Sequence, residues 1–252
     1  MLEAKPAIIA AVAAAPDSPA SGQASGPRPN RDLDAIPDGR ATEGTKPTIS
    51  LNASVVSDYR LRGITQSAGH AAVQASIELV SPAGLYTGAW GSTIATYEGA
   101  HTELDFYGGY RTKATSVDLD IGIISYLYPG ADGVSSAELY ATGAQVIGDA
   151  TIKFGISYTP RQSELGDGDG LYLFTEAEKP LPGLPLTVRG HIGRETGVDT
   201  ITGSPKLDWL LGADTHVGPA TISLAWVDAR YRGRSSQDHH SGSVVAAVAL
   251  DF

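Results

Sequence analysis

The chain contains no cysteine, which excludes disulfides, thiolate catalysis and cysteine-ligated metal sites. It also lacks any run of the ~18 apolar residues that a membrane helix needs, although 42% of its residues are hydrophobic. Basic residues are fewer than acidic ones, with 18 Lys and Arg against 28 Asp and Glu. The resulting net charge of −10 argues against nucleic acid as a partner. The 252 residues include 30 glycines and 11 tyrosines, which favours a β-rich fold with many turns.

The missing apolar run does not exclude a membrane barrel, because lipid-facing and lumen-facing residues alternate along its strands. The last ten residues, 243–252, show such alternation and end on an aromatic side chain. One face carries Val244, Val248, Leu250 and Phe252, and the other carries Val245, Ala247, Ala249 and Asp251. This period of two predicts a strand with two environments. It fits both the closing strand of an outer-membrane barrel and the last strand of a soluble sandwich.

Residues 1–47 differ in composition from the rest of the chain. A short alanine-rich apolar run, 7–15, resembles the core of a secretory signal, but its flank has one Lys opposed by Glu3. Residues 16–47 are rich in Pro, Ser, Gly, Asp and Arg and lack periodicity, which predicts a disordered tail. We therefore expect an atypical signal-like segment and tail at 1–47, followed by a barrel at 48–252.

From Thr48 onward, alternating segments and turn residues predict twelve strands. They cover 48–59, 71–81, 85–97, 102–112, 116–128, 136–147, 149–160, 170–179, 184–195, 206–217, 219–231 and 243–252. Short connections, such as Gly148-Asp149, alternate with mostly longer polar ones, such as 60–70 and 232–242. This alternation predicts an all-β, antiparallel up-and-down transmembrane barrel with short periplasmic turns. Because twelve is even, both termini are expected at the periplasmic rim.

The polar faces of these strands predict a charged lumen. The expected pore-lining residues are Glu78, Glu103, Asp105, Arg111, Asp118, Asp120, Glu138, Lys153, Glu176, Arg189 and Asp208. Carboxylates opposite cations in a narrow wet lumen form a charge filter, and the acidic excess favours cations or polar neutral solutes. Twelve strands lie between the filled eight-stranded barrels and the open porins of 16–18 strands. The same charges therefore fit either a channel lining or a salt-bridge network that plugs the lumen.

Aromatic residues gather near the predicted strand ends, as expected for the girdles at the two membrane interfaces. They are Tyr59, Tyr97, Tyr126, Tyr128, Tyr158, Tyr231 and Phe252. The phase of the segment 85–93 leaves open whether Tyr86 and Trp90 face lipid or lumen.

Two arginines, Arg60 and Arg62, follow the first predicted strand in the segment Ser57-Asp-Tyr-Arg-Leu-Arg-Gly-Ile-Thr-Gln-Ser67. They are candidates for a loop constriction, in which Arg62 folds inwards or binds an anionic solute or lipopolysaccharide phosphate. The alternative is a turn motif in which Gly63 supplies an unusual backbone angle.

This segment resembles the opening motif of the TorF-type porin family of bacterial outer-membrane proteins. The family pattern continues with a Val-Gln strand and a Gly-Leu-Tyr-x-Gly-x-Trp-Gly-Ser strand, which match 72–75 and 84–92. Later matches are 103–110 and Tyr128-Pro-Gly130. The resemblance extends from about Thr48 to Phe252, with the first ~80 residues the specific part. It implies passive transport without naming a solute. The chain departs from the family in its long Pro/Ala tail.

Other motifs carry little chemistry. Gly166-Asp-Gly-Asp-Gly170 lacks the later Glu of a calcium loop, and Asp238-His239-His240 places adjacent His side chains that rarely converge on one ion. We expect no metal and no cofactor. Some twelve-stranded barrels are phospholipases with a Ser/His pair on the lipid face, but the phase places His191 in the lumen. We therefore do not expect an enzyme.

The sequence predicts a porin-like channel of the bacterial outer membrane that passes small polar solutes or cations. Its expected partners are outer-membrane lipid, lipopolysaccharide and the barrel-insertion machinery, which would recognise the strand ending at Phe252. A partner protein or a second copy of the chain is a further candidate. The alternatives are an accessory barrel that anchors a partner complex and, less favoured, a lipid hydrolase.

Overall fold

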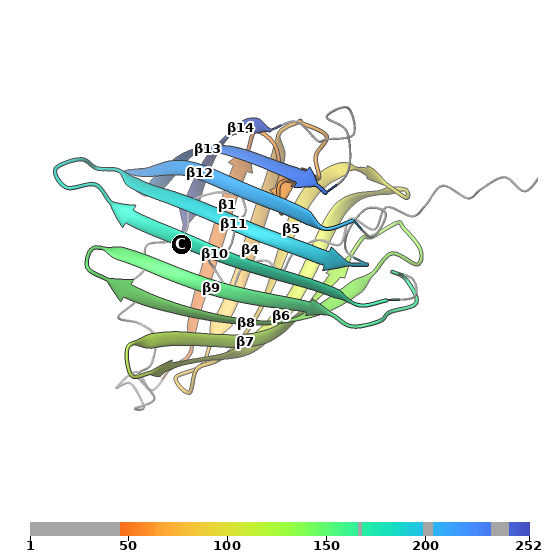
Figure 1. Ribbon diagram of the computed structural model, residues 1–252, viewed down its shortest axis with the longest axis horizontal. Coiled ribbons are helices and arrows are strands. Elements are labelled where there is room, and N and C mark those ends of the chain that lie inside the picture. The colour runs from red at the N-terminus through yellow and green to blue at the C-terminus, as the bar shows by residue number, and fades with distance from the viewer. Residues whose placement is uncertain (1–45, 166–167, 199–203, 233–241) are drawn as a thin grey trace, which may run out of the picture.

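The computed structural model describes residues 46–165, 168–198, 204–232 and 242–252. Within these residues twelve strands form one closed antiparallel barrel (Figure 1), which confirms the predicted fold class. The barrel strands are β1 (Thr48–Val56), β4 (Ala72–Val80), β5 (Leu85–Tyr97), β6 (Ala100–Ala114), β7 (Val117–Leu127), β8 (Ser136–Ile147), β9 (Ala150–Thr159), β10 (Gly170–Pro180), β11 (Thr187–Gly197), β12 (Lys206–Val217), β13 (Ala220–Tyr231) and β14 (Ser243–Asp251). No helix in the described part of the chain has the length and apolar character to cross a bilayer.

Closure depends on the pairing of the first strand with the last. β1 pairs with β14 from Val56 and Ala247 to Asn52 and Asp251, and the ladder continues to a hydrogen bond from Phe252 N to Leu51 O of 2.9 Å. Each remaining strand pairs with the barrel strands before and after it in the chain. The terminal alternation thus belongs to a barrel-closing strand, and no strand edge is left open.

The connections define two rims. The short-turn rim carries the connections 81–84, 115–116, 148–149, 181–186 and 218–219, and it also holds the start of β1 and the end of β14 (Figure 1). The opposite, long-loop rim holds the short turn Glu98-Gly99 and the strand ends that the connections 57–71, 128–135, 160–169, 198–205 and 232–242 join. Both ends of the barrel therefore lie on one rim, as the even strand count predicts.

Two strand boundaries differ from the prediction by three residues, and the others differ by at most two. β1 ends at Val56 instead of residue 59, because the chain then turns into the barrel. β11 begins at Thr187 instead of 184, since Pro185 lacks the N–H that a paired strand donates. The segment 57–71 also contains two short strands that the sequence did not predict, β2 (Arg60–Leu61) and β3 (Ile64–Thr65).

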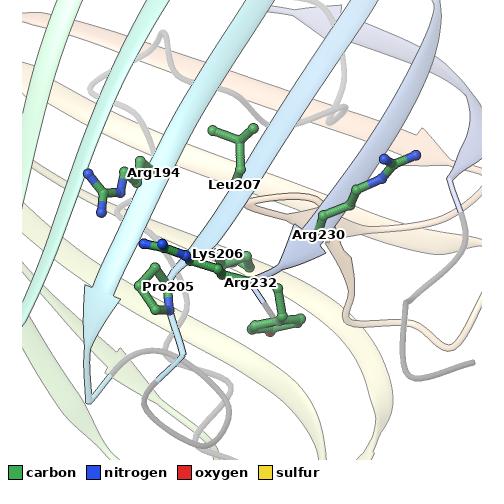
Figure 2. A pocket seen from close by; sticks show the side chains of 7 residues that line it. Arg194, Pro205, Lys206, Leu207, Arg230 and Arg232 are labelled. Atoms are coloured by element: carbon green, nitrogen blue, oxygen red, sulfur yellow. The ribbon is translucent and has the colours of Figure 1, made fainter. Parts of the chain in front are cut away.

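The outer surface of the barrel is a broad apolar band. Large side chains on it include Ile77, Phe106, Ile121, Phe154, Ile192, Leu211, Leu224 and Val248. Such a continuous exposed apolar surface fits lipid and not water. Near the long-loop rim the band gives way to exposed arginines on β11 and just beyond β13, at the cleft drawn in Figure 2.

The predicted aromatic girdle is wrong for most of its members. Tyr59, Tyr126, Tyr128 and Tyr231 are buried inside the barrel, whereas Tyr158 and Phe252 do face outward. Tyr126 shares the phase of Asp118 and Asp120 on β7, so the alternation directs it inward. Tyr86 and Trp90, whose orientation the sequence left open, also face the interior: Tyr86 is buried, and Trp90 packs against Tyr59 at 5.4 Å between ring centroids.

Glycines on the inner wall make room for aromatic rings from adjacent strands. A Cβ added at Gly155 would lie 2.0 Å from Cζ of Phe174 on β10, and one at Gly122 would lie 2.4 Å from the Tyr140 hydroxyl on β8. Each glycine is directly paired with its aromatic partner in the ladder. The far end of each ring thus lies over the paired glycine, and the ring fills the interior of the barrel.

We expect Gly155→Ala to destabilise the barrel by about 1–3 kcal/mol, because Phe174 would have to leave its packed position. The urea midpoint of unfolding measures this loss of stability. The folded fraction at each urea concentration is read from the mobility difference between unheated and boiled samples on a gel. Gly190→Ala is the matched control, since its Cβ would meet nothing closer than a backbone oxygen at 3.8 Å. Equal midpoints for the two variants would contradict the packing role.

Candidate functional site inside the barrel

The segment between β1 and β4 folds into the lumen as a hairpin, here called the inner hairpin (residues 58–67). β2 pairs with β3, and the two residues at the tip, Arg62 and Gly63, have φ of +45° and +82°. Positive φ at both central residues matches a type I′ turn, which needs Gly in at least one position. The tip touches the barrel wall so closely that a Cβ on Gly63 would lie 2.6 Å from Cβ of Ala229 on β13.

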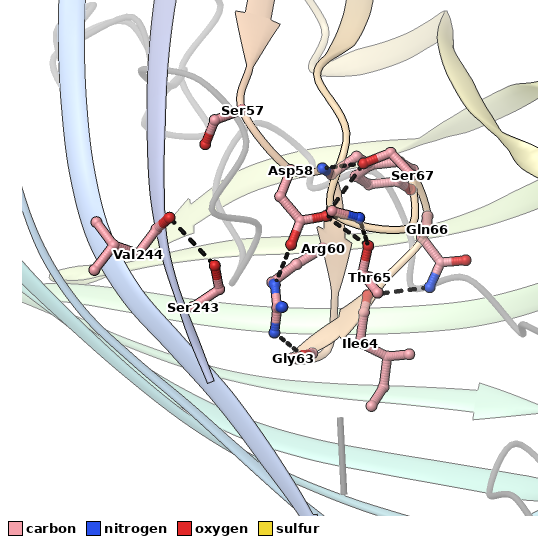
Figure 3. A network of polar contacts seen from close by, with 12 residues as sticks. Ser57, Asp58, Arg60, Gly63, Ile64, Thr65, Gln66, Ser67, Ser243 and Val244 are labelled. Atoms are coloured by element: carbon pink, nitrogen blue, oxygen red, sulfur yellow. Dashed lines mark hydrogen bonds and ion pairs between the residues drawn. The ribbon is translucent and has the colours of Figure 1, made fainter. Parts of the chain in front are cut away.

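Polar contacts hold the inner hairpin in shape (Figure 3). The Asp58 carboxylate accepts hydrogen bonds from Arg60 Nε and from Thr65 Oγ1, both at 2.5 Å. Backbone bonds from Gln66 N to Tyr59 O, 2.6 Å, and from Ala95 N to Gln66 O, 2.8 Å, fix the hairpin to itself and to β5. Arg60 therefore acts within the hairpin and does not reach across the lumen.

Arg62 reaches across the lumen to the far wall. Its Nη1 lies 2.5 Å from Glu195 Oε1 on β11, and its Nη2 lies 2.8 Å from Glu138 Oε2 on β8. Its guanidinium carbon is 4.1 Å from the centroid of the Tyr172 ring on β10. In the closed strand order β8, β10 and β11 lie opposite β1 and β4, from which the hairpin starts. A single side chain thus connects the two sides of the barrel.

Glu195 also binds Lys206 Nζ at 2.7 Å, so two cations face two carboxylates in what we call the Arg62 cluster (Arg62, Glu138, Glu195 and Lys206). The Glu138 side chain is 0% exposed, and the other three are nearly as buried. Ions removed from water in this way are stable only when they are paired. The balance of charge in the cluster meets that condition. The side chains of the cluster fill the long-loop half of the lumen.

A second set of contacts surrounds His191 in the middle of the barrel. His191 Nε2 lies 2.9 Å from Asp208 Oδ1, and Nδ1 lies 3.3 Å from Glu176 Oε1. The Tyr172 hydroxyl donates to the same Asp208 oxygen at 2.9 Å. Lys153 Nζ completes the set at 3.6 Å from Glu176 Oε2. His191 thus faces the lumen, as the strand phase predicts.

The lumen is partly open at the short-turn rim. Arg111 donates to both oxygens of Glu78, at 2.7 and 2.8 Å, and to Asp120 at 3.1 Å, with its side chain 14% exposed. The Arg111 guanidinium also stacks on the Tyr86 ring at 3.8 Å. Two further ion pairs line this end, Arg189–Asp214 at 3.0 Å and Lys113–Asp118 at 3.3 Å. The interior therefore changes from filled at the long-loop half to accessible at the other end.

Glu103 and Asp105 form an acidic pair on β6 in the filled half. Tyr128 Oη donates to Glu103 Oε1 at 3.4 Å, and burial raises the pKa of the Tyr128 hydroxyl, which keeps it protonated. Neither oxygen of Asp105 has a hydrogen-bond partner among the described residues. This pair therefore has no cation partner among the described side chains.

All eleven lining residues predicted from the sequence point into the barrel. The structure brings Arg111, Asp120 and Glu78 together at one end and Lys153 and Glu176 together in the middle. Glu195 and Lys206 were missed, although they share the inward phase of His191 and Asp208. Gly166 and Asp167 of the glycine–aspartate motif, and all of Asp238-His239-His240, lie outside the described residues.

Residues 40–247 match the model of a protein family described as "Bacterial protein of unknown function (Gcw_chp)". The chain belongs to this family. The match covers the barrel almost entirely, from before β1 into β14. No curated protein matches the chain.

Among solved structures, the barrel is similar to the KdgM porin, with 9% identity and a TM-score of 0.55 over 81% of this chain and 98% of that one. A NanC porin structure gives the same identity and TM-score over 81% and 99%. A KdgM porin in complex with disordered oligogalacturonate gives 7% identity and a TM-score of 0.52 over 81% and 97%. At such identities the likeness shows the fold alone, and that fold is the porin barrel.

We expect Arg62→Met to destabilise the barrel by about 3–5 kcal/mol, because Glu138 and Glu195 would then share Lys206 as their one cation in the cluster. Arg62→Met combined with Glu138→Gln restores one cation to one carboxylate, and it should recover a large part of the loss. Urea unfolding of both variants measures this. If the single and double variants are equally unstable, the loss reflects packing and not unpaired charge.

Proposed function

We propose that this protein is a porin-like channel of the bacterial outer membrane for passive diffusion of small polar solutes or cations. The observation that carries the proposal is a closed barrel with an apolar outer face and an ion-lined inner face. Such a barrel satisfies its backbone within lipid and offers polar side chains to a solute inside. The sequence resemblance to the TorF-type porin family supports the same function.

The inner hairpin is the proposed constriction. It occupies the long-loop half of the lumen, where Arg62 reaches the far wall and Gly63 contacts β13. A solute that enters at the short-turn rim meets the Glu78–Arg111–Asp120 group first and the inner hairpin last. We therefore propose a narrow channel whose conductance is set by the position of this hairpin.

The proposed selectivity is for cations. Eight of the eleven residues proposed to line the lumen are acidic. Rings and pairs of carboxylates favour cations in narrow pores. At the accessible end two carboxylates, Glu78 and Asp120, surround one cation, Arg111, and this group is therefore proposed to set the preference for cations.

A second candidate is an accessory barrel that anchors a partner protein or a second copy of the chain. The filled Arg62 cluster favours it, because four nearly fully buried ionic side chains leave the long-loop half without an open path in this conformation. Planar-bilayer recording separates the two candidates. Discrete conductance steps support the channel, whereas no conductance together with stable co-purification of a partner supports the accessory role.

An outer-membrane location would bring the barrel into contact with further partners. Outer-membrane lipid and lipopolysaccharide would surround the apolar band, and the barrel-insertion machinery would recognise the closing strand that ends at Phe252. Under this proposal the short-turn rim faces the periplasm and the long-loop rim faces outward.

We expect Asp118→Asn with Asp120→Asn to weaken cation preference, because two charges at the accessible end of the lumen are removed while side-chain volume is kept. The reversal potential across a salt gradient in planar bilayers measures the change. Asp132→Asn with Asp149→Asn is the matched control, since both side chains are exposed outside the lumen, one at each rim. Equal shifts in both double variants would contradict a selectivity role for the lumen carboxylates.

We expect replacement of residues 60–65 by two glycines to increase single-channel conductance several-fold, because it removes Arg62 and the hairpin tip from the lumen. Single-channel recording measures this, and heat-dependent gel mobility establishes that the barrel has folded. An unchanged conductance in a folded variant would show that the constriction lies elsewhere.

A further inference from the structure

The outer face of the barrel at the long-loop rim carries a cluster of arginines. The strand register places Arg194 on β11 opposite Leu207 on β12, and Leu207 opposite Arg230 on β13. All three side chains are exposed on the outer face. Arg232 follows just beyond β13, where its backbone N donates to Pro205 O at 2.8 Å. Figure 2 shows these side chains around a single cleft of about 470 Å³.

The arginines of this cleft have no acidic ion-pair partner among the described residues. None of the three guanidinium groups forms an ion pair with any residue in the described part of the chain. Lys206 also borders the cleft, but its ammonium group is turned inward to Glu195 at 2.7 Å. The outward carboxylate nearest in sequence, Asp228, accepts a hydrogen bond from the backbone of Ala229 at 2.8 Å. A chain of net charge −10 thus concentrates positive charge at one place on its outer face.

The position of the cluster relative to the apolar band points to a ligand with both charged and apolar parts. The next outward row toward the middle of the barrel carries Trp209, whose ring lies 5.6 Å from the Arg230 guanidinium. Beyond it, Leu211 and Trp226 are paired and are 69% and 46% exposed. Tryptophan marks the edge of the hydrocarbon region, so the arginines lie at the level of lipid headgroups.

Arginine is suited to phosphate, because its planar group donates parallel hydrogen bonds to two phosphate oxygens. Several arginines around one cleft, without an ion-paired carboxylate among the described residues, favour an anion with more than one charge. A free phosphate would satisfy the arginines but would leave the adjoining apolar surface unused. A phosphorylated lipid satisfies both.

We propose that this cleft, the outer arginine site (Arg194, Arg230 and Arg232), binds the phosphate of an anionic glycolipid in the outer leaflet. The acyl chains of the lipid would lie along the apolar strip of Leu207 and Leu211. This inference rests on the proposed membrane location and orientation of the barrel, and it is independent of whether the lumen conducts.

The test uses the full-length protein, purified in detergent and titrated with bisphosphorylated lipid A, followed by native mass spectrometry. Arg194→Gln with Arg230→Gln should weaken binding by about tenfold or more, because each lost charge-assisted contact is strong. Lys46→Gln with Lys179→Gln is the matched control. It removes the same charge from exposed side chains near the short-turn rim, and it should bind like the wild type.

Parallel titrations with dephosphorylated lipid A and with inorganic phosphate identify the source of the phosphate. Weak binding of both, beside tight binding of the bisphosphorylated lipid, supports the proposal. Inorganic phosphate that binds as tightly as the lipid would overturn the lipid assignment. Equal weakening in the two double variants would overturn the site, because it would reflect overall charge.

The failure of this inference is distinguishable from the failure of the channel. If the wild-type protein folds and conducts in bilayers but shows no preference for the phosphorylated lipid, the result supports the channel and contradicts the outer arginine site. If the protein binds the lipid through these arginines but does not conduct, the result supports the outer arginine site and contradicts the channel.

Discussion

Closure of the sheet is the constraint on which the rest of the structure depends. In lipid every backbone donor and acceptor must be satisfied within the protein, and the pairing of β1 with β14 achieves this for the last open edge. Closure then assigns each alternate residue to the inside or the outside. It fixes the bore, and a lumen of this size holds both the charged side chains and a hairpin that fills its long-loop half.

The charged interior explains why the inner hairpin folds inward. Glu138 on β8 and Glu195 on β11 face the lumen, with Lys206 as their one cation from the wall within the Arg62 cluster. Two buried carboxylates that share one cation are costly, and Arg62 supplies the second. Arg62 takes a positive φ beside Gly63, which lets the hairpin turn tightly enough to deliver that charge across the barrel.

The sequence predicted the strands and their faces because a period of two is a local signal. It left open whether Arg62 folds inwards, because the path of the inner hairpin depends on Glu138 and Glu195, which lie 76 and 133 residues away from Arg62. The error in the predicted aromatic girdle has a different cause. Tyr126 lies in phase with Asp118 and Asp120, so the local alternation already directs it inward.

The two proposed functional surfaces use the same wall of the barrel. Strand alternation places Glu195 inside and Arg194 outside on β11, and it places Lys206 inside and Leu207 outside on β12. β13 contributes Arg230 to the outer surface and Ala229, which contacts the hairpin tip, to the inner one. A lipid phosphate bound between Arg194 and Arg230 would therefore hold together the strands against which the inner hairpin packs. The outer lipid and the inner hairpin would then stabilise one wall from its two sides.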